Sequence, residues 1–333
     1  MLTNFPSGLS SFGIPLFGGV LGVGNVYIVA DTTSSAYASL NARFGGEYYD
    51  DNTAMFYPHT STASAVTTNG LLNALNACTT DRNDYVLVSP SANTYYTDVL
   101  LAMKKKAVHF MCPGSMTCQV GCMNSVRIQQ IGAAISIISI QNGGIEVAGF
   151  YLKNITGYSH IEILDTSTAT ASAWGLSIHH NYFVSRSSST TLPMLAGIGD
   201  GGSYSRIENN WFTSQVSGGT WTTGVVNITG TCVNTDVTGN IVNIGNTGNA
   251  TYGIRNLSVN GLVANNLFSE CGTSTITSCV TIGATGAAIG NRCAVATGHF
   301  SDVSGTTGVS YCDNADGITN SQGTYKQTGQ LES

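Results

Sequence analysis

The chain has 333 residues and a formal net charge of −6. Charged residues make up only 9% of it, against about 25% in an ordinary soluble domain. The acidic balance argues against a nucleic-acid partner, since phosphate recognition requires a basic face. The one basic run is Lys104, Lys105 and Lys106, which is typical of a solvated surface loop.

Residues 1–24 are apolar and rich in Gly and Pro. They contain no Lys or Arg and are interrupted by Pro6 and Pro15, so they match neither a secretory signal peptide nor a membrane span. A segment this hydrophobic is unfavourable in water, yet its glycines and prolines disfavour a core helix. We expect an extended N-terminal arm that is buried against a partner. The alternative is that it packs along the chain's own first coil.

Residues 25–84 are expected to cap the N-terminal end of the molecule. Within them, residues 25–31 are predicted to form a strand. Residues 66–78 are predicted to form a short amphipathic helix with Asn69 or Thr68 as its N-cap. Such a helix would cover the open strand edge of the first coil, which would otherwise promote aggregation.

Residues 32–65 fit no coil and combine six aromatic residues with Glu47, Asp50 and Asp51. The segment is long for a loop inside a compact domain, which indicates a functional insertion or part of a subunit interface. Neighbouring acids beside aromatic rings are also compatible with binding of sugar or calcium. However, the alternating oxygen ligands of a calcium loop are absent.

From residue 85 to residue 312 the pattern changes to short Val- and Ile-rich strands separated by turn residues, with no helical periodicity. Five segments of the second half share one motif, with an apolar residue three positions before an asparagine and another two positions after it. The intervals between these asparagines are 29, 30, 26 and 25 residues, which indicates a solenoid. The asparagines are Asn181, Asn210, Asn240, Asn266 and Asn291.

A unit of this length has room for short strands only, so the sequence predicts an all-β fold, a single-stranded parallel β-helix. We expect each repeated asparagine to occupy a bend in left-handed backbone geometry. Successive coils stack about 4.8 Å apart, so the side-chain amides should form a hydrogen-bonded structural ladder. Asn154 is expected to mark one further, divergent rung.

Nine cysteines cannot form a complete disulfide framework, because the number is odd. Cys112, Cys118 and Cys122 cluster near His109, but their spacings match no standard zinc motif. We therefore predict buried thiols in a reducing compartment and no metal or cofactor. Residues 313–333 are a polar C-terminal tail without a strand pattern.

An enzymatic alternative rests on acidic residues that neighbouring coils would bring together. Glycoside hydrolysis needs two carboxyl groups about 5 to 9 Å apart. Asp165 and Asp200 follow equivalent strands of successive coils, and His179 and Glu208 each lie two residues before a ladder asparagine. These four residues are the catalytic candidates of the alternative.

Against that alternative, the positions equivalent to Glu208 in later coils are Thr238, Ala264 and Ile289. The face therefore loses its ionisable groups along this row. His179 and Glu208 are equally well explained as a surface ion pair, worth under about 1 kcal/mol. No catalytic residue is favoured.

The order of these elements resembles a known family. The strand Gly24–Asp31, the capping helix, the strand beginning at Asp84 and the Asn-marked coils are similar to the pectate-lyase-like right-handed parallel β-helix. More specifically, they resemble β-helical virion proteins of tailed bacteriophages, which open with a Gly-x-Val-Tyr-x-Val-Asp-like strand. Here one extra alanine precedes the aspartate.

This resemblance implies a non-enzymatic virion structural protein, such as a fibre, spike or capsid decoration. It also implies a homotrimer joined to other virion proteins through the N-terminal arm and assembled in the host cytoplasm, without a signal peptide or membrane insertion. The protein could contact a host surface glycan. The alternative is a tailspike-type protein that binds or cleaves polysaccharide.

Overall fold

The computed structural model describes most of the chain from Gly24 onward. The described residues are 24–113, 126–131, 135–155, 157–164, 173–185, 192–214, 220–245, 248–270, 275–283, 285–294, 299–302, 310–312 and 315–316. Most of the expected arm (1–24) and of the expected tail (313–333) therefore lies outside this set. In the described part, no helix is long and apolar enough to cross a membrane.

The described strands form three long sheets, and all their pairings are parallel except that of β2 with β3. This confirms the expectation of an all-β parallel solenoid. The first sheet has the order β29 (Ser310–Cys312), β26 (Ala287–Ile289), β23 (Leu262–Ala264), β20 (Asp236–Thr238), β16 (Arg206–Glu208), β13 (Ser177–His179), β10 (Glu146–Ala148), β7 (Val108–Met111), β4 (Asp84–Val88), β1 (Val26–Asp31), β2 (Phe56–Thr62) and β3 (Ala65–Thr68).

The other two sheets repeat the same order of coils. The second sheet contains β30 (Ala315–Asp316), β27 (Arg292–Ala294), β24 (Leu267–Glu270), β21 (Ile241–Ile244), β17 (Trp211–Ser214), β14 (Tyr182–Ser185), β11 (Tyr151–Asn154), β8 (Arg127–Gln130) and β5 (Thr94–Thr97). The third contains β28 (His299–Asp302), β25 (Thr275–Ile282), β22 (Asn249–Asn256), β19 (Val226–Ile228), β15 (Leu195–Gly197), β12 (Ile161–Ile163), β9 (Ile138–Ile140) and β6 (Leu101–Met103), with β18 (Thr220–Trp221) beside β22.

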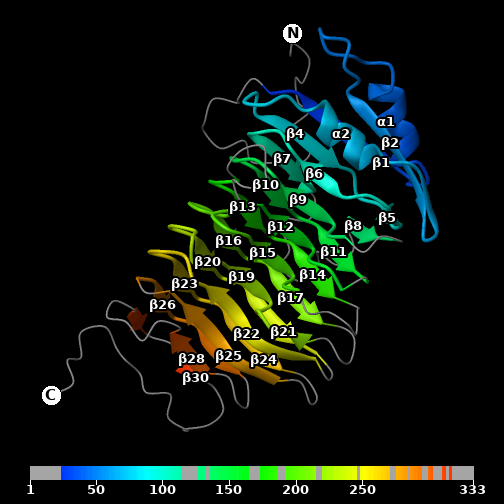
Figure 1. The fold of residues 1–333 in the computed structure, drawn as a ribbon. Coiled ribbons are helices and arrows are strands. Elements are labelled where there is room, and N and C mark those ends of the chain that lie inside the picture. Colours follow the sequence, from blue (N-terminus) through cyan, green and yellow to red (C-terminus); the bar gives the residue numbers. More distant parts are fainter. Residues whose placement is uncertain are drawn as a thin grey trace, which may run out of the picture.

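From β4 onward the chain visits the first, second and third sheets in turn, with β18 and β19 both beside β22, so each turn of the chain makes one coil. Strands β13, β14 and β15 form one coil, and β16, β17 and β19 form the next. Figure 1 shows the coils stacked along one direction, with the helices at the N-terminal end of the stack. The molecule is therefore a rod made of layers, each of which contacts the layers before and after it.

Equivalent inward positions of successive coils stack on one another and fill the interior. Ile178 pairs in register with Ile207 and Phe183 with Phe212, and all four side chains are fully buried. The rings of Phe183 and Phe212 are stacked, with centroids 4.5 Å apart. The alternation of strand residues places every second side chain in this core. Burial of each such side chain contributes about 1.5–3 kcal/mol.

The bend between the first and second sheets is left-handed, but not at the residue that the sequence suggested. The residue before each ladder asparagine has positive φ, including His180 (54°), Asn209 (54°) and Asn265 (56°). The expectation that the ladder asparagine itself adopts this geometry is wrong. Asn, His and Gly occupy the preceding position because they tolerate it best.

Asn154 is not a rung of the ladder, contrary to expectation. In its coil the ladder position belongs to Phe150, whose backbone nitrogen donates to Asn181 Oδ1 at 3.1 Å. Asn154 ends β11, and its amide donates to the carbonyl oxygens of Tyr158 and Ser159. The spacing of 27 residues between Asn154 and Asn181 matches the repeat. The Asn154 side chain nevertheless binds the loop that follows β11 and makes no ladder contact.

The helix predicted near residue 70 is present but shorter than expected. Helix α2 spans Gly70–Ala77, and the Asn69 side chain caps it by accepting a hydrogen bond from Leu72 N at 3.1 Å. Residues 66–68 belong to β3 instead, because β-branched Val and Thr favour a strand. Leu71 and Leu75 of α2 are buried in the core beside β1, β2 and β6.

Part of segment 32–65 joins the first sheet, so the expectation that it fits no coil is wrong for β2. Strand β2 pairs in parallel with β1, and helix α1 (Tyr37–Phe44) buries Phe44 in a cluster with residues of both strands. Tyr49 and Tyr57 place their rings edge-on against Tyr27, with centroids 5.6 and 5.9 Å away. The sequence pattern did not predict β2 because the strand contains Pro58 and His59, and neither residue is typical of a sheet interior.

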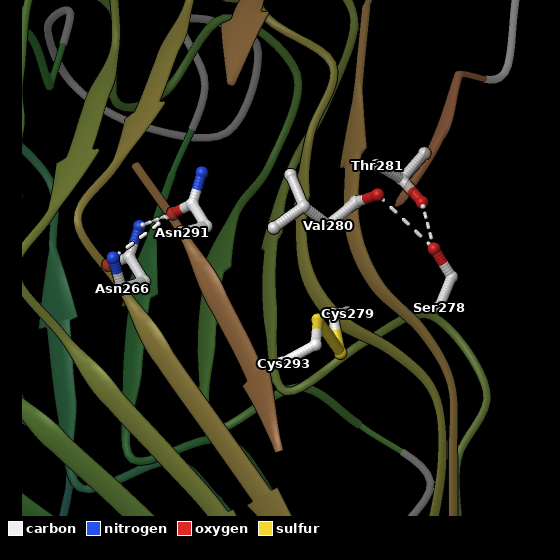
Figure 2. The surroundings of a disulfide bond; sticks show 7 residues. All are labelled: Asn266, Ser278, Cys279, Val280, Thr281, Asn291 and Cys293. Carbon is white, nitrogen blue, oxygen red and sulfur yellow. Dashed lines mark hydrogen bonds between the residues drawn. A yellow bond between two sulfur atoms is a disulfide. The ribbon is translucent and has the colours of Figure 1, made fainter. Parts of the chain in front are cut away.

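Not all cysteines are thiols. A disulfide joins Cys279 of β25 to Cys293 of β27, with Cα atoms 6.4 Å apart (Figure 2). Both residues are buried, and their strands belong to successive coils, which corrects the expectation of thiols for this pair. Cys78 and Cys232 are free and buried, as expected. Cys118 and Cys122 of the rejected zinc cluster lie outside the described residues.

Candidate functional site

The five repeated asparagines form one buried ladder along the rod. Asn210 Oδ1 accepts two hydrogen bonds from Asn181 in the preceding coil, one from the backbone nitrogen (3.0 Å) and one from Nδ2 (3.1 Å). The same pair of contacts links Asn210 to Asn240, Asn240 to Asn266, and Asn266 to Asn291. Figure 2 shows the last of these links.

Each ladder amide also binds the main chain of the preceding coil. Nδ2 of Asn210, for example, donates to Ile178 O at 2.9 Å. Asn210 therefore donates two hydrogen bonds through Nδ2 and accepts two through Oδ1, which satisfies the whole side-chain amide. A buried amide that is fully satisfied in this way holds a bend and leaves nothing for a ligand.

The ionisable groups lie on the outer face of the first sheet, in two rows of residues that are paired from coil to coil. One row contains Tyr85, His109, Glu146, Ser177, Arg206, Asp236, Leu262 and Ala287. The second contains Leu87, Met111, Ala148, His179, Glu208, Thr238, Ala264 and Ile289. Both rows become apolar toward the C-terminal coils.

Glu146 lies at the centre of a cluster that crosses three coils. Its Oε2 is 2.5 Å from His109 Nδ1, and its Oε1 is 2.7 Å from His179 Nε2. Beyond these, His109 Nε2 lies 2.6 Å from Asn83 Oδ1, and His179 Nδ1 lies 2.8 Å from His180 Nδ1. The ring of Tyr85 stacks on His109 with centroids 4.4 Å apart.

These contacts determine where the protons are. An ionised carboxylate only accepts hydrogen bonds, so His109 Nδ1 and His179 Nε2 both donate to Glu146. Burial alone would raise the pKa of Glu146, but the hydrogen bonds from His109 and His179 outweigh it and lower the pKa to about 2. Glu146 is therefore a carboxylate throughout the physiological range.

Of the four catalytic candidates of the enzymatic alternative, the structure pairs two and places a third elsewhere. His179 and Glu208 face each other across β13 and β16, but the hydrogen bond of His179 Nε2 goes to Glu146. Asp200 lies in the turn that follows β15, on another side of the coil. Asp165 lies outside the described residues.

Three ionisable residues of this face were missed by the sequence reasoning, namely His109, Glu146 and Asp236. His109 and Glu146 belong to coils without a ladder asparagine, so no motif predicted which residues of the neighbouring coils lie beside them. Asp236 lies opposite Arg206 and one coil from Glu208. Burial raises the pKa of Asp236, Arg206 lowers it, and Glu208 raises it, with a net upward shift.

No group of three or more His, Cys, Asp and Glu side chains in the described part of the chain has the arrangement of a metal site. Comparison with protein-family models, curated proteins and solved structures finds no match for this chain.

Proposed function

We propose that this protein is a non-enzymatic structural rod. The observation that carries the proposal is the continuous ladder from Asn181 to Asn291, which is buried and hydrogen-bonded at every step. The amide groups of this ladder all bind neighbouring coils. They therefore stiffen the rod and leave no polar group free to bind a ligand.

We further propose that the solenoid is a right-handed parallel β-helix. A connection between parallel strands of one sheet is right-handed in about 98% of known cases. Strands β13 and β16, which are parallel neighbours in the first sheet, are joined through β14 and β15 in the other two sheets. This preference and the family resemblance support the same hand.

The setting that we propose for this rod is a virion of a tailed bacteriophage, as a fibre, spike or capsid decoration built from three copies. The support is the resemblance of the strand Gly24–Asp31 and of the coils that follow to such proteins. The apolar segment 1–24 would attach the trimer to other virion proteins. A trimer with closed symmetry would place three rods in parallel.

Two measurements test this proposal. Light scattering of the purified full chain should give three times the 34.6 kDa mass of one chain. Gold-labelled antibodies raised against the protein should decorate intact phage particles from the source sample. A monomer that labels no particle would overturn the proposal.

Cleavage of a host glycan is the second candidate, and one observation favours it. Glu208 and Asp236 are carboxyl groups on adjacent coils of one face, and the pKa of Asp236 is raised by burial. Two carboxyl groups, one of them with a raised pKa, are the arrangement that glycoside hydrolysis uses. New reducing ends in bacterial surface glycans, produced by the native chain but not by Glu208→Gln or Asp236→Asn, would establish this activity in place of the structural role.

A further inference from the structure

His179 and His180 contact each other through their ring nitrogens, and the proposed structural role does not require this contact. Their Nδ1 atoms lie 2.8 Å apart. A hydrogen bond between two ring nitrogens needs a proton on one and a lone pair on the other. Only one of the two Nδ1 atoms can therefore carry a proton while the contact exists.

The other nitrogen of His179 is already committed. His179 Nε2 lies 2.7 Å from the ionised carboxylate of Glu146 and therefore donates a proton to it. The closed pair then has three forms. Both rings are neutral and His180 donates to His179, or His180 is an imidazolium that donates to a neutral His179, or His179 is an imidazolium that donates to a neutral His180. In none of these forms does the pair carry two positive charges.

We propose that the His179–His180 contact is a proton-operated latch, which is closed while the pair carries at most one positive charge and opens when His180 also becomes an imidazolium. Opening separates the two rings, because two Nδ1–H groups would face each other at hydrogen-bond distance. His179 stays in place through its hydrogen bond to Glu146, so His180 is the ring that moves.

The charged and titratable groups around the latch come from five strands of the first sheet, β4, β7, β10, β16 and β20. They are Tyr85, His109, Glu146, Glu208, Arg206 and Asp236. Burial, and after it the neighbouring His179, lower the pKa of His180, although Glu208 acts in the opposite direction. Because the pKa of Glu146 is about 2, its carboxylate stays ionised through the range in which His180 titrates. The latch therefore opens in mild acid while the Glu146 contacts persist.

The backbone allows the side chain of His180 to leave without rearrangement. His180 has φ 54°, and the equivalent residues Asn209 and Asn265 have φ 54° and 56°. The left-handed bend is thus a property of every such coil and does not depend on the imidazole. For the same reason His180→Asn places at this position the residue that two other coils already use.

The test is a pH titration of the full chain with isotope-labelled histidines, followed by NMR. The chain has six histidines, and single substitutions assign their signals. We expect His180 to titrate with a midpoint below the ordinary value of about 6.5. The ring signals of His179 should shift at that same midpoint, and this shift should disappear in His180→Asn.

Two outcomes would overturn the latch. One is a His180 that titrates at the ordinary midpoint. The other is a His179 whose titration is the same in the native chain and in His180→Asn. An unchanged thermal unfolding midpoint in His180→Asn ensures that the comparison reports on the imidazole contact and not on misfolding. The proposed function is tested separately, by the mass of the assembly, so the result of this titration neither supports nor contradicts it.

Discussion

A single oxygen atom of Asn210 accepts two hydrogen bonds from Asn181, one from the backbone nitrogen at 3.0 Å and one from Nδ2 at 3.1 Å. The asparagine thus joins two coils through both main chain and side chain. Because the same arrangement recurs down to Asn291, loss of one amide removes partners from the coils on both sides. The ladder is therefore a set of coupled contacts.

Removal of one ladder amide should destabilise the rod strongly. Asn266→Ala removes the acceptor of Asn240 N and Nδ2 and the donor to Val237 O and Asn291 Oδ1. A buried polar group left unsatisfied costs about 1–3 kcal/mol, so several together should cost at least about 3 kcal/mol. Urea unfolding followed by circular dichroism measures the loss.

The matched control for that change is the adjacent residue. Asn265→Gly keeps the left-handed backbone at φ 56° and alters a side chain that is exposed. It should shift stability by no more than about 1 kcal/mol. Equal losses in Asn265→Gly and Asn266→Ala would contradict the ladder as the source of the stability.

At the N-terminal end, a buried carboxylate joins three segments of chain. Asp84 is fully buried and accepts from Asn25 N (2.8 Å), Thr79 N (2.7 Å) and the Arg82 guanidinium (2.7 and 2.9 Å). Loss of one partner of a fully buried ion pair costs about 3–5 kcal/mol, and the cost here should lie below that range because 25% of the Arg82 side chain is exposed and Asp51 also lies near its guanidinium. Asp84→Asn should lower the thermal unfolding midpoint accordingly, as calorimetry would measure.

Asp51 provides the comparison for this effect, since it contacts the same guanidinium from the surface. Its carboxylate lies 3.8 Å from Arg82 Nη1, and half of its side chain is exposed. Exposed ion pairs contribute little to stability, because water screens them. Asp51→Asn should therefore leave the midpoint nearly unchanged, and a drop as large as that of Asp84→Asn would refute the role given to burial.

The repeat was visible in the sequence because each coil obeys the same local rule. The apolar positions around Asn210 and Asn240 have to face inward in every layer, so stacking preserves the pattern even where loop lengths differ. In contrast, Phe150 occupies a ladder position without an asparagine. The coils before Asn181 consequently gave no register from sequence.

The cluster around Glu146 was unpredictable for the same reason. Its contacts to His109 and His179 connect residues 37 and 33 positions away in sequence. The contact with His179 also runs diagonally, because the strand partner of Glu146 is Ser177. Diagonal neighbours are within reach of long side chains. Whether His179 contacts Glu146 or Glu208 depends on the orientation of the side chains, and no local sequence pattern encodes that orientation.

The disulfide between Cys279 and Cys293 should stabilise the C-terminal coils. It links residues 14 positions apart, and closing a loop of about 15 residues is worth about 3 kcal/mol in the chain-entropy account. Reduction should lower the unfolding midpoint, and Cys279→Ala should make the protein insensitive to the reductant. Peptide mapping without reduction should recover the linked pair. Recovery of both cysteines in alkylated form from the denatured, unreduced protein would show that the bond is absent.

Mild acid should destabilise the folded chain through His160. This ring is buried, Nε2 donates to Val184 O at 2.8 Å, and Nδ1 has no hydrogen-bond partner. Burial lowers the pKa of His160 to about 4, whereas an unfolded histidine titrates near about 6.5. Between these values the unfolded state binds more protons, so the stability is complete above pH 6.5 and falls as the pH decreases toward 4.

The size of this effect follows from the difference between the two values. It amounts to as much as about 3 kcal/mol over the whole window, since one pKa unit corresponds to about 1.4 kcal/mol. His160→Gln keeps a donor for Val184 O but cannot titrate, so its unfolding free energy should depend less on pH. Urea unfolding at pH 5 and pH 7 measures the difference for both proteins. His59, whose pKa burial also lowers to about 4, should leave a residual dependence of the same sign in His160→Gln. An equally steep loss in both proteins would assign the acid sensitivity to groups other than His160.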